Sequence, residues 1–379
     1  MPIEALTHLG PMPVATFMRR YWQRRPLLVR QALRDFVAPI DRERLFALAR
    51  RDDVESRLVT SFSGWRLRHG PLRALPSLRR PRWTLLVQGV DCHDERAAAL
   101  LARFRFVPDA RLDDLMVSYA TDGGGVGPHV DAYDVFLLQA RGRRRWRIGP
   151  CRDARLRPGL PLAILQRFEP SDEWVLEPGD LLYLPPGVAH EGTAIGADCI
   201  TCSIGFRAPA WRELLDPWLD TLSGRWQPRG RYRDPGAPPT RHPGRLPPQM
   251  IDAAFAALTR LRPRRDDAAR MLLAELTEPK PQIVFEPPRR SLPLARLAEL
   301  AARRGLRLDR RTRMLYAGGR VAINGEVFEV QAPERRHLQV LADRRALSPH
   351  ALRRLDRATM RRLWDWYRAG WLHPCEEQA

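Results

Sequence analysis

Two side chains beside a glycine-rich stretch could hold a metal ion. Residues 123–127 read Gly-Gly-Gly-Val-Gly, and Pro128, His129 and Asp131 follow closely. Successive side chains of an extended strand alternate between two faces, so His129 and Asp131 should point the same way. An imidazole and a carboxylate at this spacing can bind one cation from two sides, although a lone histidine is more often a structural residue.

A third ligand has to come from elsewhere in the chain, and the best candidate is His190, which follows the Pro-Pro-Gly corner at residues 185–187. Two histidines and one carboxylate on one side of a metal form the facial triad of non-haem Fe(II) oxygenases, which leaves coordination positions open. A 2-oxo acid can fill two of these positions and dioxygen the third. The three residues therefore predict an oxygenase that uses Fe(II) and a 2-oxo acid.

Arg144 is the candidate ligand for that acid. Residues 143–148 read Arg-Arg-Arg-Trp-Arg-Ile, and alternation puts Arg144 on the same face as Trp146 and Ile148, which should be buried. A buried charge without a partner is costly, so Arg144 needs an anion. A bidentate grip on the distal carboxylate of 2-oxoglutarate would supply one, and an internal salt bridge is the alternative.

The surrounding sequence predicts a β core. From Leu115 to Phe206, short apolar runs are separated by glycine and proline, a pattern typical of a barrel or sandwich. The strand with the first two metal ligands should continue to Leu138, which would put Tyr133 on the ligand face. Gly142 should form the turn after that strand.

The last strand of this core, near residues 199–205, places the hydroxyl of Thr201 where it could reach the co-substrate. Cys199 and Cys202 form a CxxC motif in the same strand, where they should face opposite sides and share no metal. The chain has five cysteines, and an odd number argues against a disulfide scaffold.

Helical patterns flank the core on both sides. The N-terminal patterns cover residues 13–25, before Pro26, and 41–51, with strands near 56–61 and 83–88. The C-terminal patterns cover residues 211–222, 250–262, 266–277, 294–304, 334–345 and 359–370. Residues 225–249 are rich in proline and predict a linker. Strands near 313–317 and 320–330, with a turn at Asn324-Gly325, complete a winged-helix pattern.

The composition narrows the class of protein. The 379 residues are 44% hydrophobic, and no apolar run reaches the ~18 residues of a membrane span, so we expect no membrane contact. The N-terminus resembles no signal peptide, which predicts a cytoplasmic protein. The net charge is +20, with Lys280 as the single lysine. Such a charge favours attraction to RNA or ribosomes, or else reflects a solvated arginine-rich surface.

Several motifs in fixed order resemble the bacterial JmjC-domain ribosomal oxygenases of the cupin superfamily. They are residues 21–26, 113–116, 123–131, 133–136, 142–147, 177–180, 185–187, 190–192 and 205–209. The resemblance implies an α+β fold: a double-stranded β-helix core with N-terminal helices in residues 1–209, a helical dimerisation region with a Pro-rich loop in 210–285, and a winged-helix-like domain in 286–379.

The resemblance also implies roles for single residues. Iron would be held by His129, Asp131 and His190, with Arg144 and Ser118 contacting 2-oxoglutarate. The substrate would be an arginine side chain of a large-subunit ribosomal protein. A carboxylate should meet that arginine, and Asp122, in the loop before the glycines, is the candidate. A homodimer is implied as well.

Two other functions stay open from sequence. The first is a JmjC hydroxylase or demethylase that acts on another protein or on RNA. The second is a nucleic-acid-binding regulator with a vestigial cupin, which the basic C-terminal region suggests. The intact set of metal-ligand candidates and Arg144 argue against the second.

Overall fold

The computed structural model describes residues 3–225, 231–233, 235, 245–260 and 262–376. The chain divides into two compact units. The first comprises Met1–Ala208, Pro279–Thr312 and Val340–Ala379, and the second Pro209–Glu278 and Arg313–Gln339. Most of the predicted Pro-rich linker lies outside the described residues. Among the helices that are described, none has the length and apolar character needed to span a bilayer.

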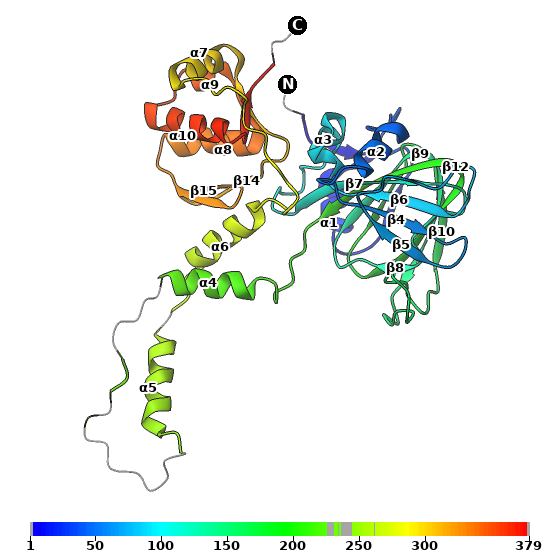
Figure 1. Ribbon diagram of the computed structural model, residues 1–379, viewed down its shortest axis with the longest axis horizontal. Coiled ribbons are helices and arrows are strands. Elements are labelled where there is room, and N and C mark those ends of the chain that lie inside the picture. The colour runs from blue at the N-terminus through cyan, green and yellow to red at the C-terminus, as the bar shows by residue number, and fades with distance from the viewer. Residues whose placement is uncertain (1–2, 226–230, 234, 236–244, 261, 377–379) are drawn as a thin grey trace. The chain divides into compact units, whose positions relative to one another are not determined.

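A ten-stranded sheet forms the core of the first unit (Figure 1). Its strands are β3 (Leu27–Val29), β4 (Ser56–Thr60), β5 (Arg66–His69), β6 (Trp83–Val87), β7 (Leu112–Ala120), β8 (His129–Val130), β9 (Val135–Pro150), β10 (Asp172–Leu176), β11 (Leu181–Leu184) and β12 (Val188–Phe206). The hydrogen-bonded order is β3-β11-β9-β12-β7-β6-β4-β5, and β10 pairs with β9 and β8 with β12. The long strands β9 and β12 pair with each other along most of their length, and they hold Arg144 on β9 and His190 and Thr201 on β12.

The structure corrects two expectations about these strands. Gly142 does not form a turn between two strands, because β9 continues through it, with Gly142 at a φ of 64°. A Cβ there would lie 2.9 Å from the carbonyl oxygen of Asp198 on β12, so the close approach of the two bent strands requires glycine. The ligand strand is also shorter than expected. It ends at Val130, and strand alternation therefore does not fix the orientation of Tyr133.

Three short helices accompany the sheet in the N-terminal part. They are α1 (Val14–Arg20), α2 (Arg42–Ala49) and α3 (Glu95–Ala102), as the apolar patterns predicted for the first two. Asp41 and Asp94 cap α2 and α3 by accepting hydrogen bonds from backbone N–H groups of the first turn. Phe17 of α1 is fully buried against the rings of Phe136 and Tyr183, which fixes this helix on the sheet.

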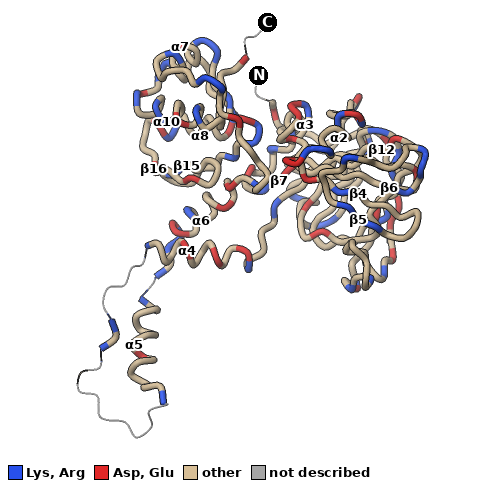
Figure 2. Tube along the Cα trace, viewed as in Figure 1, with Lys and Arg blue, Asp and Glu red and all other residues tan. Residues whose placement is uncertain are grey.

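A two-stranded pair of β1 (His8–Leu9) and β2 (Met12–Pro13) precedes α1, and a 3-10 turn spans Val90–Cys92. The other elements follow β12. They are α4 (Leu215–Arg225), α5 (Pro248–Thr259), α6 (Arg265–Thr277), α7 (Leu294–Arg304), β13 (Leu306–Leu308), β14 (Met314–Ala317), β15 (Arg320–Ile323), β16 (Glu326–Glu329), α8 (Glu334–Arg344), β17 (Ala346–Leu347), α9 (Pro349–Leu352), α10 (Arg357–Arg368) and β18 (Leu372–Pro374). The predicted hairpin turn is confirmed, with Asn324 and Gly325 both at positive φ. Figure 2 shows that basic residues are spread over many elements of both units.

A partly buried ionic cluster in the first unit involves the single lysine. The Nζ of Lys280 lies 3.1 Å from a carboxylate oxygen of Asp113 and 3.0 Å from one of Asp114. Asp114 also accepts hydrogen bonds from the Gln88 side chain and the Gly89 backbone. Because Asp114 is 3% exposed, its charge depends on these partners, and the cluster ties the segment after α6 to β7.

Candidate metal centre

Strand register brings the two histidines together. His190 on β12 lies directly opposite His129 on β8, so both side chains occupy the same face of the sheet. Their ring centroids are 4.2 Å apart, and Nε2 of His190 lies 3.6 Å from a carboxylate oxygen of Asp131. The three side chains offer ligand atoms that all lie within 4.8 Å of one another. The predicted metal ligands therefore converge on one point.

Hydrogen bonds prepare both imidazoles for a metal. Nδ1 of His129 lies 3.0 Å from the carbonyl oxygen of Gly127, and Nδ1 of His190 lies 3.0 Å from that of Val188. Each Nδ1 therefore donates its proton to a carbonyl, which leaves the Nε2 lone pair for a cation. Burial, with His129 nearby, lowers the pKa of His190 to about 4, so that this ligand is neutral near pH 7.

The glycine-rich loop allows β8 to reach β12. The backbone of Gly124 accepts a hydrogen bond from Ala194 N, and Gly123 N donates one to the Ala194 carbonyl. A Cβ on Gly125 would lie 2.5 Å from the carbonyl oxygen of Gly192, a contact that no side chain tolerates. The run of glycines thus lets the loop lie flat against β12, two residues beyond His190, and delivers His129 to its partner.

Arg144 points into the same space as the histidines, as alternation predicted. On β9, Ile148 lies opposite His190, Trp146 opposite Gly192 and Arg144 opposite Ala194, so these side chains share one face. Arg144 is 5% exposed, and its Nε and Nη2 atoms have no hydrogen-bond partner among the described residues. The predicted alternative, an internal salt bridge, is therefore absent from the described residues.

Unpartnered polar atoms gather in this interior. Seven buried side-chain nitrogen or oxygen atoms of the described residues lack a partner, and four of them belong to Thr84, Arg144 and Trp146. Thr84 lies opposite Ala120, whose other neighbour is Cys199 on β12. Ala120, Cys199 and Ala194 pack together, and Ala194 is the residue opposite Arg144. Buried polar atoms are rarely left unpaired, so this interior is suited to a polar ligand.

Arg144 and the metal ligands are suitably spaced for a diacid. Arg144 lies four positions before Ile148, the residue opposite His190, which is about 13 Å along a strand. An arginine side chain and a bound five-carbon diacid together fill such a gap. Thr84 was not predicted, because its hydroxyl becomes important only through neighbours that are distant in sequence.

The other four predicted site residues differ in burial: Ser118 and Thr201 are buried, whereas Asp122 and Tyr133 are exposed. Ser118 on β7 is buried opposite Thr201, and the Thr201 hydroxyl donates to Gln139 at 3.0 Å. Asp122 is exposed and accepts a hydrogen bond from Gly196 N at 2.7 Å, so it braces a loop. Tyr133 is 42% exposed, next to the metal-ligand candidate Asp131. The predicted ligand roles of these four residues stay predictions.

A double-stranded β-helix with a His-Asp-His centre defines the chain as a JmjC-type oxygenase of the cupin superfamily. The JmjC domain family matches residues 99–214, and the ROXA-like winged helix family matches residues 258–373. The chain is 37% identical to the Escherichia coli protein named ribosomal protein uL16 3-hydroxylase, over 88% of this chain and 89% of that protein. The chain therefore belongs to the ribosomal oxygenase family.

Further comparisons agree. A probable ribosomal oxygenase of Haemophilus influenzae is 39% identical over 53% of this chain and 51% of that protein. The crystal structure of E. coli YcfD matches with a TM-score of 0.85 and 34% identity, covering 97% of this chain and all of that one. A structure of YcfD in complex with cobalt and 2-oxoglutarate matches with a TM-score of 0.83 and 33% identity, over 97% and 99% of the two chains.

Proposed function

We propose that this protein is an Fe(II)- and 2-oxoglutarate-dependent dioxygenase that hydroxylates an arginine side chain of the large-subunit ribosomal protein uL16. One observation carries the proposal. The three metal-ligand candidates converge in the same interior in which Arg144 lies buried, with its Nε and Nη2 atoms unpartnered among the described residues. The E. coli relative is named for hydroxylation of uL16, which supports the choice of substrate.

The residues of the chain divide the work. His129, Asp131 and His190 would hold the cation, and Arg144 would hold the distal carboxylate of 2-oxoglutarate. When bound, the iron supplies oxidising power sufficient to hydroxylate an unactivated C–H bond, using dioxygen and 2-oxoglutarate. Trp146, whose ring centroid lies 6.0 Å from that of His190, and Ile148, opposite His190, would give this interior an apolar wall that excludes water. Ser118, Thr201 and the unpredicted Thr84 are further candidates for contacts to the co-substrate.

The substrate side of the site is a separate part of the proposal. An arginine substrate needs a carboxylate partner near the metal. Asp122 is exposed, and its bond to Gly196 N holds it in a fixed place. The half-exposed ring of Tyr133 beside Asp131 offers an aromatic face for a guanidinium. These two residues would set the choice of substrate.

The test is a mass measurement on the product. Purified uL16 is incubated with the enzyme, Fe(II), 2-oxoglutarate and air, and then digested and sequenced by mass spectrometry. The proposal predicts the added mass of one oxygen atom on one arginine, with succinate formed in equal amount. His129→Ala should abolish both products, and Arg143→Ala, on the opposite face of β9, should leave both unchanged.

Other outcomes would identify a different reaction. Oxygen added to a histidine would favour the activity named for insect relatives, such as the histidyl-hydroxylase of Aedes aegypti, which is 27% identical over 55% of this chain. Turnover of 2-oxoglutarate without any change to uL16 would leave the oxygenase chemistry in place with another substrate. Full activity of His129→Ala would refute the proposed centre.

The second unit supports the proposal of a homodimer. No residue of α5 is buried, and its apolar side chains stand 39–68% exposed: Met250, Ile251, Phe255 and Leu258. Leu219 of α4 is 53% exposed and Trp211 is 89% exposed. Apolar surface of this kind marks an interface, and a second copy of the chain is the occupant that the family resemblance suggests.

The oligomeric state can be measured directly. Light scattering coupled to gel filtration should give twice the mass of one chain for the wild type. Phe255→Glu should give the mass of one chain, because a charge would be buried in the interface. The matched variant Asp252→Asn, on the same helix, should stay dimeric, and a monomeric wild type would refute the proposal.

Three further assignments belong to the proposal. The enzyme would work in the cytoplasm, where its ribosomal substrate is made. Residues 1–209 would carry the catalytic centre, residues 210–285 dimerisation and residues 286–379 contacts outside the active site. Contact with the ribosome or its RNA is the role expected for that last part.

A further inference from the structure

A basic cavity lies in the first unit, away from the metal-ligand candidates. Its volume is about 1100 Å³, and its walls come from α3, α7, β13 and the segments after α8 and around β18. Seven arginines line it against three carboxylates. The arginines are Arg105, Arg303, Arg304, Arg307, Arg310, Arg344 and Arg345, and the carboxylates belong to Glu95, Asp309 and Glu376. The cavity therefore carries an excess of positive charge.

Arg345 is the least compensated cation of the inner wall. Its Nη2 donates to the backbone carbonyl of Asp309 at 2.7 Å, and no carboxylate of the described residues lies within ion-pair distance of its guanidinium. The nearby acids are engaged elsewhere: Asp109 binds Arg105 through two hydrogen bonds, and the Asp309 carboxylate lies 3.0 Å from His373. Burial lowers the pKa of the Arg345 guanidinium, which is a sign of an unfavourable charge.

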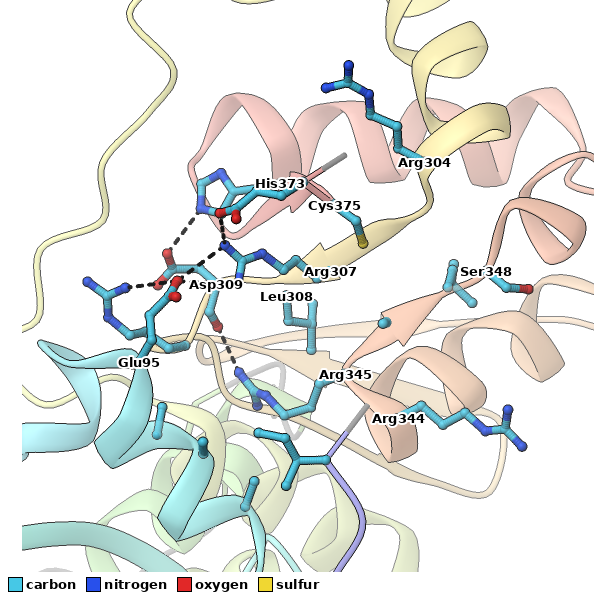
Figure 3. A pocket seen from close by; sticks show the side chains of 18 of the residues that line it. Glu95, Arg304, Arg307, Leu308, Asp309, Arg344, Arg345, Ser348, His373 and Cys375 are labelled. Atoms are coloured by element: carbon cyan, nitrogen blue, oxygen red, sulfur yellow. Dashed lines mark hydrogen bonds and ion pairs between the residues drawn. The ribbon is translucent and has the colours of Figure 1, made fainter. Parts of the chain in front are cut away.

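Figure 3 shows how the charged groups are arranged around the cavity. Arg307 and Arg345 turn toward Glu95 and Asp309, whereas Arg304 and Arg344 extend away from that cluster. Arg307 and Arg310 share Glu95, at 3.3 and 4.0 Å, and Arg307 also lies 3.3 Å from Glu376, so these two guanidinium groups have two carboxylates. Arg303, Arg344 and Arg345 have no ion-pair partner among the described residues, so charge compensation in the cavity is incomplete.

The outer arginines can reach a ligand. Arg303 and Arg344 are exposed, and neither forms an ion pair with a described residue. Both lie in the last turns of α7 and α8, where a basic residue is favoured by the helix dipole alone. That explanation does not extend to Arg345, which follows α8 in a left-handed conformation at a φ of 56°, nor to Arg105.

The lining also limits the chemistry of the ligand. Among the described residues that line the cavity, His373 is the only one with an aromatic ring, and the uncharged part of the wall is largely apolar, with Leu300, Leu308 and Val340. Without aromatic rings there is no platform for stacking bases, so recognition of nucleobases is not expected. Guanidinium groups match phosphate oxygens through paired hydrogen bonds, and several arginines together suit several phosphates.

We propose that this cavity is a binding site for closely spaced phosphate groups, supplied by the backbone of an RNA or by a free oligophosphate. Arg345 and Arg105 form the inner wall, and Arg303 and Arg344 close over the ligand from the rim. This site is independent of the oxygenase reaction, so its test does not need a turnover assay.

Inorganic tripolyphosphate is the probe, titrated calorimetrically into the full-length protein at low salt. The proposal predicts saturable binding with one site per chain. Arg303→Glu combined with Arg344→Glu should weaken it by about tenfold or more, because two phosphate contacts are lost. The matched control is Arg354→Glu with Arg357→Glu, two exposed arginines outside the cavity, which changes the net charge equally. The control should bind nearly as the wild type does.

The result also distinguishes the two sources of phosphate. A duplex RNA that displaces tripolyphosphate, with a salt dependence reduced by about two ions in the cavity variant, identifies an RNA backbone. Tripolyphosphate binding that RNA cannot displace identifies a free oligophosphate. Absence of saturable binding, or equal weakening in both double variants, would overturn the proposal.

Discussion

Removing the charge of Arg144 should have opposite effects on two quantities, the stability of the ligand-free protein and the affinity for 2-oxoglutarate. The variant is Arg144→Met, which keeps an unbranched side chain of similar length and removes the charge. In the structure this guanidinium is 5% exposed, with Nε and Nη2 unpartnered among the described residues. Removing such a charge from the ligand-free protein should therefore leave the free energy of unfolding unchanged or raise it by about 1–4 kcal/mol.

The effect on 2-oxoglutarate should be a large loss. A hydrogen bond to a charged group contributes about 1.5–3 kcal/mol, and a bidentate pair contains two of them. Losing both corresponds to about 3 kcal/mol or more, hence to a dissociation constant raised about a hundredfold or more. A diacid at a hundred times its dissociation constant adds about 2.7 kcal/mol of stability to the wild type and almost none to the variant.

The assay is thermal unfolding with Mn(II) in place of iron, with and without 2-oxoglutarate, so that no turnover occurs. The wild type should melt at a higher temperature with 2-oxoglutarate, and Arg144→Met should melt at the same temperature with and without it. Arg143→Met is the control, since Arg143 is exposed on the opposite face of β9. A normal 2-oxoglutarate response in Arg144→Met, or a ligand-free melting temperature far below that of the wild type, would refute the reasoning.

Two further predictions concern packing and charge. Gly192→Ala should lower the free energy of unfolding by about 1–3 kcal/mol in urea titrations, because its Cβ would lie 2.7 Å from the Trp146 ring; Gly224→Ala, in open space, should cost nothing. Lys280→Met should lower the free energy of unfolding by about 3 kcal/mol, because the buried Asp114 carboxylate would lose its ion-pair partner. Burial opposes it, but the neighbouring carboxylates raise the pKa of Lys280, so the wild type should keep this advantage in full below the ordinary pKa of lysine and lose it progressively as the pH rises from there through the raised pKa. An advantage already lost at pH 9 would contradict this assignment.

Arg144 could be predicted from sequence because strand alternation places it on the same face as Trp146 and Ile148, whose burial is easy to predict. The same alternation predicts that His129 and Asp131 point the same way, but β8 ends at Val130, so the position of Asp131 beside the histidines depends on the loop that follows the strand. Convergence of His190 with His129 could only be assumed, because strand register is set by pairing between distant segments.

Other features depend on three-dimensional context. Gly142 has the composition of a turn, but the close approach of Asp198 makes it a bend within one long strand. Tyr133 lies outside the strand that was expected to contain it, because β8 ends after two residues. The Thr84 hydroxyl, which has no hydrogen-bond partner in the described part of the chain, and Arg345, which has no ion-pair partner there, could not be found from local sequence, because neighbours distant in sequence decide both.

The most direct measurement is anomalous diffraction from crystals of the protein grown with Co(II) and 2-oxoglutarate. We predict one strong anomalous peak within bonding distance of His129, Asp131 and His190, with the distal carboxylate of the diacid against the Arg144 guanidinium. A peak bound to other residues, or a diacid that makes no contact with Arg144, would contradict the central claim.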